Sequence, residues 1–134
     1  MASDKLVTRS MRVAGVSFHQ ADVKNIRVSD CVILVPELDN IHDQHAIRID
    51  VLTHQDGTPS LAITNVTIGH IPAECCLLVK EACFSRNFVG ALIEGLDRPN
   101  ADSPIGVRLK FFFTKDIMPK SLYPKECHRH ESRS

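Results

Sequence analysis

The sequence DNIHDQHAIRI, residues 39–49, joins a polar segment to the clearest strand pattern in the chain. From Ala46 to Val51, isoleucines and a valine alternate with Arg48 and Asp50. A period of two places successive side chains on opposite faces of a strand. We therefore expect a half-buried strand here, with a polar loop immediately before it.

Other short apolar runs flank this strand and are separated by single Gly and Pro residues, as in a chain of short strands. A cluster of turn-forming residues, which includes Asp56 and Gly57, predicts a hairpin directly after the Ala46–Val51 strand. The remaining strands are expected at Met11–Phe18, Cys31–Val35, Leu61–Ile63, Thr67–Ile71, Phe88–Leu96 and Ile105–Thr114.

One helix is expected from Ala73 to Phe84, because Pro72 suits a first helical turn and the residues that follow have helical spacing. Several short strands with a helix before the last pair predict a mainly β fold, a small and partly open barrel. We expect one domain over residues 11–116, an N-terminal tail over 1–10 and a C-terminal tail over 117–134.

The composition is typical of one folded domain, with 43% hydrophobic and 24% charged residues in 134. Sixteen basic residues balance sixteen acidic ones, so no net field attracts nucleic acid or anionic lipid at long range. Aromatic residues are only 5%, which leaves few platforms for base stacking.

The chain shows neither the apolar core of a signal peptide nor a run of membrane-spanning length, and we expect an intracellular protein without membrane contact.

Five cysteines form an odd set, and Cys75, Cys76 and Cys83 fall within the expected helix, so we expect reduced thiols. Residues 127–130, Cys-His-Arg-His, have metal-binding side chains, but their spacing fits no standard zinc module. No nucleophile elbow, phosphate-binding glycine loop or zinc-protease motif occurs. The sequence therefore predicts a protein that is not an enzyme and holds no metal or cofactor.

Three segments have an order and spacing that together form a family pattern: VAGVSF at 13–18, the block at 40–49, and IGHIP at 68–72. They correspond to a strand with V-x-G, an N-x-x-D-x-x-A-I-x-V element and a G-[HY]-[IL]-[PK] element before a helix. On these residues the chain resembles the HIRAN family, named for the N-terminal regions of chromatin-remodelling-type DNA repair ATPases. The resemblance extends over about residues 12–114.

The resemblance implies an OB-like or SH3-like barrel of about six strands with one or two short helices. It also implies binding of single-stranded DNA at its free 3′-hydroxyl end, in DNA repair or at replication forks in the nucleus. The ATPase motor of relatives is absent from these 134 residues, so a protein partner carrying such a motor is expected. The alternative is a HIRAN-fold adaptor that binds protein and has lost DNA binding.

Two residues of the polar loop have a site role by resemblance and an alternative structural role. Asp43 matches the carboxylate that contacts the terminal 3′-hydroxyl; a carboxylate accepts a hydrogen bond from a hydroxyl and repels a phosphate. Alternatively, Asp43 caps the turn before the Ala46 strand. Asn40 either contacts nucleotide or, as we favour, holds the loop.

Four further positions complete the expected contacts. Phe18 and His19 match an aromatic pair that stacks on terminal bases, although a lone Phe at a strand end is more often a core residue. His42 replaces an aromatic residue and offers a flat ring. His70 either donates to a phosphate or satisfies a local hydrogen bond.

Two cations of a DNA-binding family member are missing from the pattern. Ser17 stands where that member has Arg, and Ala73 stands where it has Lys. Each lost contact lowers the salt dependence of binding by roughly one unit and the affinity by about a kcal/mol. Basic residues that offer replacements are Arg12, Lys24, Arg27 and Arg48.

Overall fold

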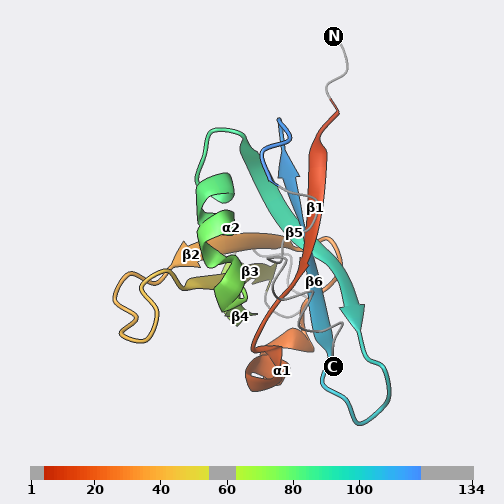
Figure 1. Ribbon diagram of the computed structural model, residues 1–134. Coiled ribbons are helices and arrows are strands. Elements are labelled where there is room, and N and C mark those ends of the chain that lie inside the picture. Colours follow the sequence, from red (N-terminus) through yellow and green to blue (C-terminus); the bar gives the residue numbers. More distant parts are fainter. Residues whose placement is uncertain (1–4, 55–62, 119–134) are drawn as a thin grey trace, which may run out of the picture.

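The structure, a computed structural model, describes residues 5–54 and 63–118. These residues form one antiparallel six-stranded sheet of order β1-β6-β5-β2-β3-β4 (Figure 1). The strands are β1 (Val7–Arg12), β2 (Cys31–Pro36), β3 (Ile47–His54), β4 (Ile63–His70), β5 (Phe88–Asp97) and β6 (Gly106–Phe113). The helical segments are η1 (Val16–His19), α1 (Gln20–Val23), η2 (Ala73–Cys75) and α2 (Cys76–Cys83).

The sheet is not closed along its edge strands, but one bridge joins its two edges. After β1 ends, the backbone N–H of Val13 still donates to Val107 of β6, at 2.9 Å. The next residue, Ala14, then exchanges two backbone hydrogen bonds with His70 at the end of β4, at 2.8 and 2.9 Å. The described residues thus confirm a mainly β, OB-like fold in the form of an open sheet.

The core lies on the inner faces of the strands. Ile47, Ile49 and Val51 of β3 are fully buried, as their alternation predicts. Phe111 and Phe113 of β6 are also fully buried and pack against other aromatic rings of the core. These side chains remove large apolar areas from water, which is the main favourable term in folding.

Four of the expected strands are confirmed with shifts of one to three residues at their ends, namely those that became β2, β3, β5 and β6. The expected run Thr67–Ile71 belongs to a longer strand, β4, except for Ile71, and β4 pairs with β3 through a register shift after Ile49. Of the expected run Leu61–Ile63, Ile63 begins β4, and residues 61 and 62 lie outside the described residues. The expected Asp56-Gly57 turn, between β3 and β4, lies outside the described residues. The expected helix is η2 followed by α2, with Pro72 at the N-cap of η2.

The expected strand Met11–Phe18 is wrong in its bounds. Gly15 adopts a left-handed backbone, with φ of 77°, and the chain turns there into η1. The strand begins earlier, at Val7, because residues 7–12 pair along β6. Residues 7–10 therefore belong to the sheet rather than to a tail, and Met118, expected in the C-terminal tail, is buried in the core.

No disulfide joins the cysteines of the described ranges, of which Cys31 is exposed and Cys75, Cys76 and Cys83 are buried. Burial raises the pKa of the Cys83 thiol to about 12. The Cys-His-Arg-His segment at 127–130 lies outside the described residues. Among the helices of the described ranges, none is long and apolar enough to cross a bilayer.

Gly69 lies directly against Val13 and Ala14, next to the bridge that joins the two edges of the sheet. A Cβ atom there would overlap the carbonyl oxygen of Ala14 and lie 2.6 Å from Cγ1 of Val13. We expect Gly69→Ala to disrupt the bridge and lower the free energy of unfolding by about 2–3 kcal/mol, because backbone must move to admit the methyl group. Urea denaturation followed by circular dichroism measures the change.

The matched control is Gly90→Ala in β5, where an added Cβ meets no atom within 4 Å. This control is expected to change stability by less than about 1 kcal/mol. Equal stability of the Gly69 and Gly90 variants would contradict the close approach.

Candidate nucleic-acid interface

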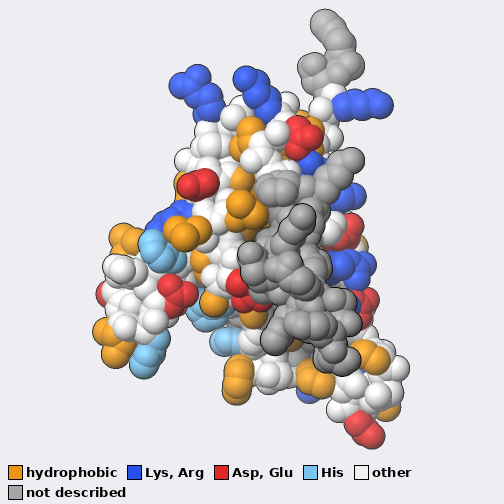
Figure 2. Space-filling model, viewed as in Figure 1, with side chains coloured by type: hydrophobic (Ala, Val, Ile, Leu, Met, Phe, Trp, Pro, Cys, Tyr) orange, Lys and Arg blue, Asp and Glu red, His pale blue; other side chains and the backbone are white. Residues whose placement is uncertain are grey.

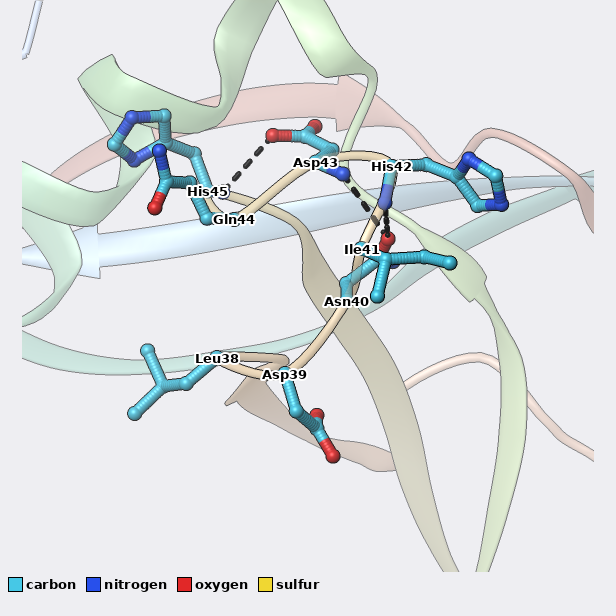
Figure 3. Close-up of a pocket in the computed structure, with 8 residues that line it drawn as sticks. All are labelled: Leu38, Asp39, Asn40, Ile41, His42, Asp43, Gln44 and His45. Atoms are coloured by element: carbon cyan, nitrogen blue, oxygen red, sulfur yellow. Dashed lines mark hydrogen bonds between the residues drawn. The ribbon is translucent and has the colours of Figure 1, made fainter.

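The loop between β2 and β3 is held in shape by Asn40 (Figure 3). Its side-chain oxygen accepts hydrogen bonds from the backbone N–H groups of His42 and Asp43, at 2.8 and 3.0 Å. Its side-chain nitrogen donates to Oε1 of Glu37 at 3.2 Å. Asn40 therefore has the structural role favoured on sequence grounds, as an Asn that organises a turn.

Asp43 caps the turn before β3, which was the structural alternative for this residue. Its Oδ1 accepts the backbone N–H of His45 at 2.9 Å, and its carbonyl oxygen accepts that of Ala46 at 3.1 Å. Within the described part of the chain, the second carboxylate oxygen has no hydrogen bond. The Asp43 carboxylate is partly exposed and retains one oxygen for a ligand.

Residues 38–45 line a shallow hollow of about 690 Å³, and the loop extends away from the sheet (Figures 1 and 3). The His42 ring is exposed and points away from the Asp43 carboxylate. His42 and Asp43 therefore share the loop but face different sides of it.

His70 connects β4 to this loop through Glu37. The Nε2 atom of His70 lies 3.0 Å from Oε1 of Glu37, the same oxygen that accepts from Asn40. Partial burial raises the pKa of Glu37, but the hydrogen bonds from Asn40 and His70 and the charge of Arg48 outweigh it, so the pKa is lowered. His70 thus makes the local hydrogen bond that was its alternative role, and its side chain is still 38% exposed.

A buried ion pair lies beside this network. Asp50 is only 3% exposed and accepts two hydrogen bonds from Arg48, at 2.9 and 3.0 Å, and one from Thr67 at 2.8 Å. Burial raises the pKa of Asp50, but the hydrogen bonds from Arg48 and Thr67 and the charge of Arg48 outweigh this effect, so the pKa is lowered. Arg48 is therefore occupied by Asp50 and supplies little free positive charge to a ligand.

The predicted stacking pair lies on η1, which packs against β4 next to the Ala14–His70 bridge. Phe18 is 86% exposed, so the interpretation of this residue as part of the core is wrong. His19 follows it and is half-buried. The bridge and His70 connect η1, which carries this pair, to the loop. Within the described residues, the Phe18 and His19 side chains make no hydrogen bond to the loop.

The predicted replacement cations differ in how free they are. Arg12 lies 3.3 Å from Asp97, and Arg48 is paired with Asp50. Lys24 and Arg27, just after α1, are exposed, and their side chains have no ion pair within the described ranges. Ser17 and Ala73, at the positions of the missing cations, are also exposed.

A comparison with protein families matches the HIRAN domain model to residues 8–93, more than half of the chain. The chain belongs to the HIRAN domain family. HIRAN domains are nucleic-acid-binding modules rather than catalytic ones. No curated protein and no solved structure matches the chain.

The network around Glu37 was missed by sequence reasoning. Glu37 follows Pro36 at the end of a strand and belongs to none of the HIRAN elements. The one feature of the sequence that could have indicated this polar network is Asp50. It is a carboxylate inside a strand, and a buried carboxylate needs a partner. No cluster of three metal-binding side chains occurs in the described ranges.

We expect Asn40→Ala to loosen the loop, because three hydrogen bonds to its side chain are lost. The free energy of unfolding should fall by about 1–2 kcal/mol, and amide exchange at His42 and Asp43 should accelerate. Hydrogen exchange followed by NMR measures both effects. Gln44→Ala, an exposed change in the same loop, is the control, and similar exchange in the two variants would contradict this role of Asn40.

Proposed function

We propose that this HIRAN domain binds single-stranded DNA and reads its free 3′-hydroxyl end. The observation that carries the proposal is the free oxygen of the Asp43 carboxylate, on a loop that Asn40 holds in shape. A carboxylate accepts a hydrogen bond from a terminal hydroxyl. It repels a terminal phosphate or a continuing phosphodiester, so it selects the end of a strand.

Phe18 supports the proposal as a stacking platform. Its ring is almost fully exposed on η1, an arrangement that costs the folded protein hydrophobic burial and suits a base as partner. Stacking of a base on an aromatic side chain contributes about 1–3 kcal/mol. His19 and His42 offer two further flat rings, from η1 and from the loop.

The charges of the site favour end recognition over general phosphate binding. The protein has no net charge, and two of its candidate cations are paired with carboxylates. Lys24 and Arg27 remain for the DNA backbone. Such a site has a shallow salt dependence and selects its ligand through the hydroxyl and the stacked bases.

The biological setting of this binding is part of the proposal. We infer that the domain acts in the nucleus, in DNA repair or at replication forks. There it would deliver a strand end to a protein partner that carries an ATPase motor.

One observation favours the adaptor alternative. At the loop tip, Leu38 and Ile41 are 75% and 90% exposed and lie beside Asp39, and no Lys or Arg occurs in residues 38–45. Hydrophobic, acidic and histidine side chains gather on this projection (Figure 2). An apolar, acidic tip suits a basic protein surface better than a DNA backbone.

The two functions are separated by fluorescence anisotropy with one short oligonucleotide that ends in either a 3′-hydroxyl or a 3′-phosphate. We expect the 3′-hydroxyl form to bind at least about tenfold more tightly, because the Asp43 carboxylate repels the phosphate. An oligonucleotide with a 5′-phosphate and a 3′-hydroxyl should bind with the same affinity as the 3′-hydroxyl form. Equal binding of both 3′ forms, or none, would rule out end reading.

Asp43→Asn tests the residue itself without removing the turn. The Asn oxygen still accepts the His45 N–H, whereas the negative charge is lost. We expect the variant to keep its melting temperature and to bind the two 3′ forms within about twofold of each other. Asp39→Asn, in the same loop, is the charge-matched control and should keep the preference; retained preference in Asp43→Asn would contradict the role of Asp43.

A further inference from the structure

The hydrogen bond between His70 and Glu37 decides which nitrogen of the imidazole carries a proton. Glu37 has a lowered pKa, so near neutral pH it is a carboxylate and only accepts. The Nε2 atom, 3.0 Å from Oε1 of Glu37, must therefore be the donor. In a neutral ring the other nitrogen, Nδ1, is then an acceptor and has no hydrogen for a phosphate.

Protonation of His70 changes both the donor pattern and the local charge. As an imidazolium, the ring keeps Nε2–H on Glu37 and gains an Nδ1–H. With neutral His70, the group formed by Arg48, Glu37, Asp50 and His70 has one positive and two negative charges, a net charge of −1. With imidazolium the same group is neutral, so the local repulsion of a phosphate falls.

We propose that Glu37 is a positioning residue that makes His70 a phosphate contact only as imidazolium, so that binding of a DNA strand strengthens as the pH falls. This inference rests on the proposed function and concerns the phosphates next to the strand end. Glu37 also receives the Asn40 hydrogen bond, so one carboxylate positions both the loop and the histidine.

Charged and titratable groups lie on the elements packed against β4 and at the residue bonded to His70. Glu37 comes from the end of β2, Arg48 and Asp50 from the start of β3, His19 from η1 and Asp22 from α1. Asp50 holds the Arg48 guanidinium in a pair of two hydrogen bonds. His19 is a second imidazole on an element packed against β4, so variants of His70 itself are needed to assign the effect.

The test is the affinity for a short oligo-dT with a free 3′-hydroxyl, measured by fluorescence anisotropy between about pH 5.5 and pH 8, where histidine titrates. Thymine and the phosphodiesters do not titrate there, and Glu37 stays ionised because its hydrogen bonds and nearby positive charge lower its pKa from the ordinary value of a glutamate. We expect the natural protein to bind about five- to tenfold more tightly at pH 5.5 than at pH 8, because the imidazolium adds one charge-assisted hydrogen bond to a phosphate. His70→Gln, which keeps a donor for Glu37 but does not titrate, should change less than about twofold.

Glu37→Gln separates positioning from a purely structural role. The variant removes the negative charge and no longer fixes the donor nitrogen, so binding at pH 8 should strengthen and the pH dependence should flatten. A structural role alone predicts weaker binding at every pH. Glu81→Gln, an exposed change on α2, is the charge-matched control and should keep the natural pH dependence.

Ring ¹⁵N spectra of the free protein at pH 8 provide a readout independent of DNA and should show the proton of His70 on Nε2. A proton on Nδ1, or unchanged pH dependence in His70→Gln, would overturn the inference. Binding that prefers a 3′-hydroxyl but does not vary with pH would overturn this inference alone. Absence of binding at every pH would overturn the proposed function as well.

Discussion

Two backbone hydrogen bonds between Ala14 and His70 bring the parts of the candidate interface together. Ala14 directly precedes the turn into η1, which carries Phe18, and His70 is bonded through Glu37 to the loop that carries Asp43. Segments far apart in the sequence thus become neighbours at one end of an open sheet. This contact requires a glycine at position 69, because a Cβ atom on Gly69 would not fit against the Ala14 carbonyl group.

The polar groups near this bridge are largely paired within the protein. Glu37, Arg48 and Asp50 hold one another and the loop, so they shape the interface and add little free charge to it. Exposed Phe18 and the free carboxylate oxygen of Asp43 remain for a ligand. We propose that such a site selects its ligand by stacking and by hydroxyl recognition, whereas a basic surface would bind any strand through its phosphates.

Most of the fold could be predicted from the sequence because its inner strands alternate clearly, as β3 does, or are continuously apolar, as β2 is. The first strand was misplaced because the pattern of VTRSMR, residues 7–12, is mixed and the more apolar run after it is interrupted by a left-handed Gly15. An edge strand needs few apolar residues, and its position is set by pairing with β6, which local sequence does not encode.

The candidate site was predictable where a residue belongs to a family element, as Asn40, Asp43 and His70 do. The exposure of Phe18 was not predictable from the sequence, because it depends on how the chain turns into η1 at Gly15. Glu37 was missed because its partners, Asn40 and His70, are 3 and 33 residues away in sequence, and only folding brings all three together.

The central claim is that the bridge makes one interface of η1, His70 and the loop. An NMR titration of the ¹⁵N-labelled domain with a short 3′-hydroxyl oligonucleotide tests it most directly. The signals of Phe18, His70 and the loop residues 40–43 should shift together along one binding curve, with one dissociation constant. Shifts confined to η1 or to the loop, or two different dissociation constants, would contradict a single interface.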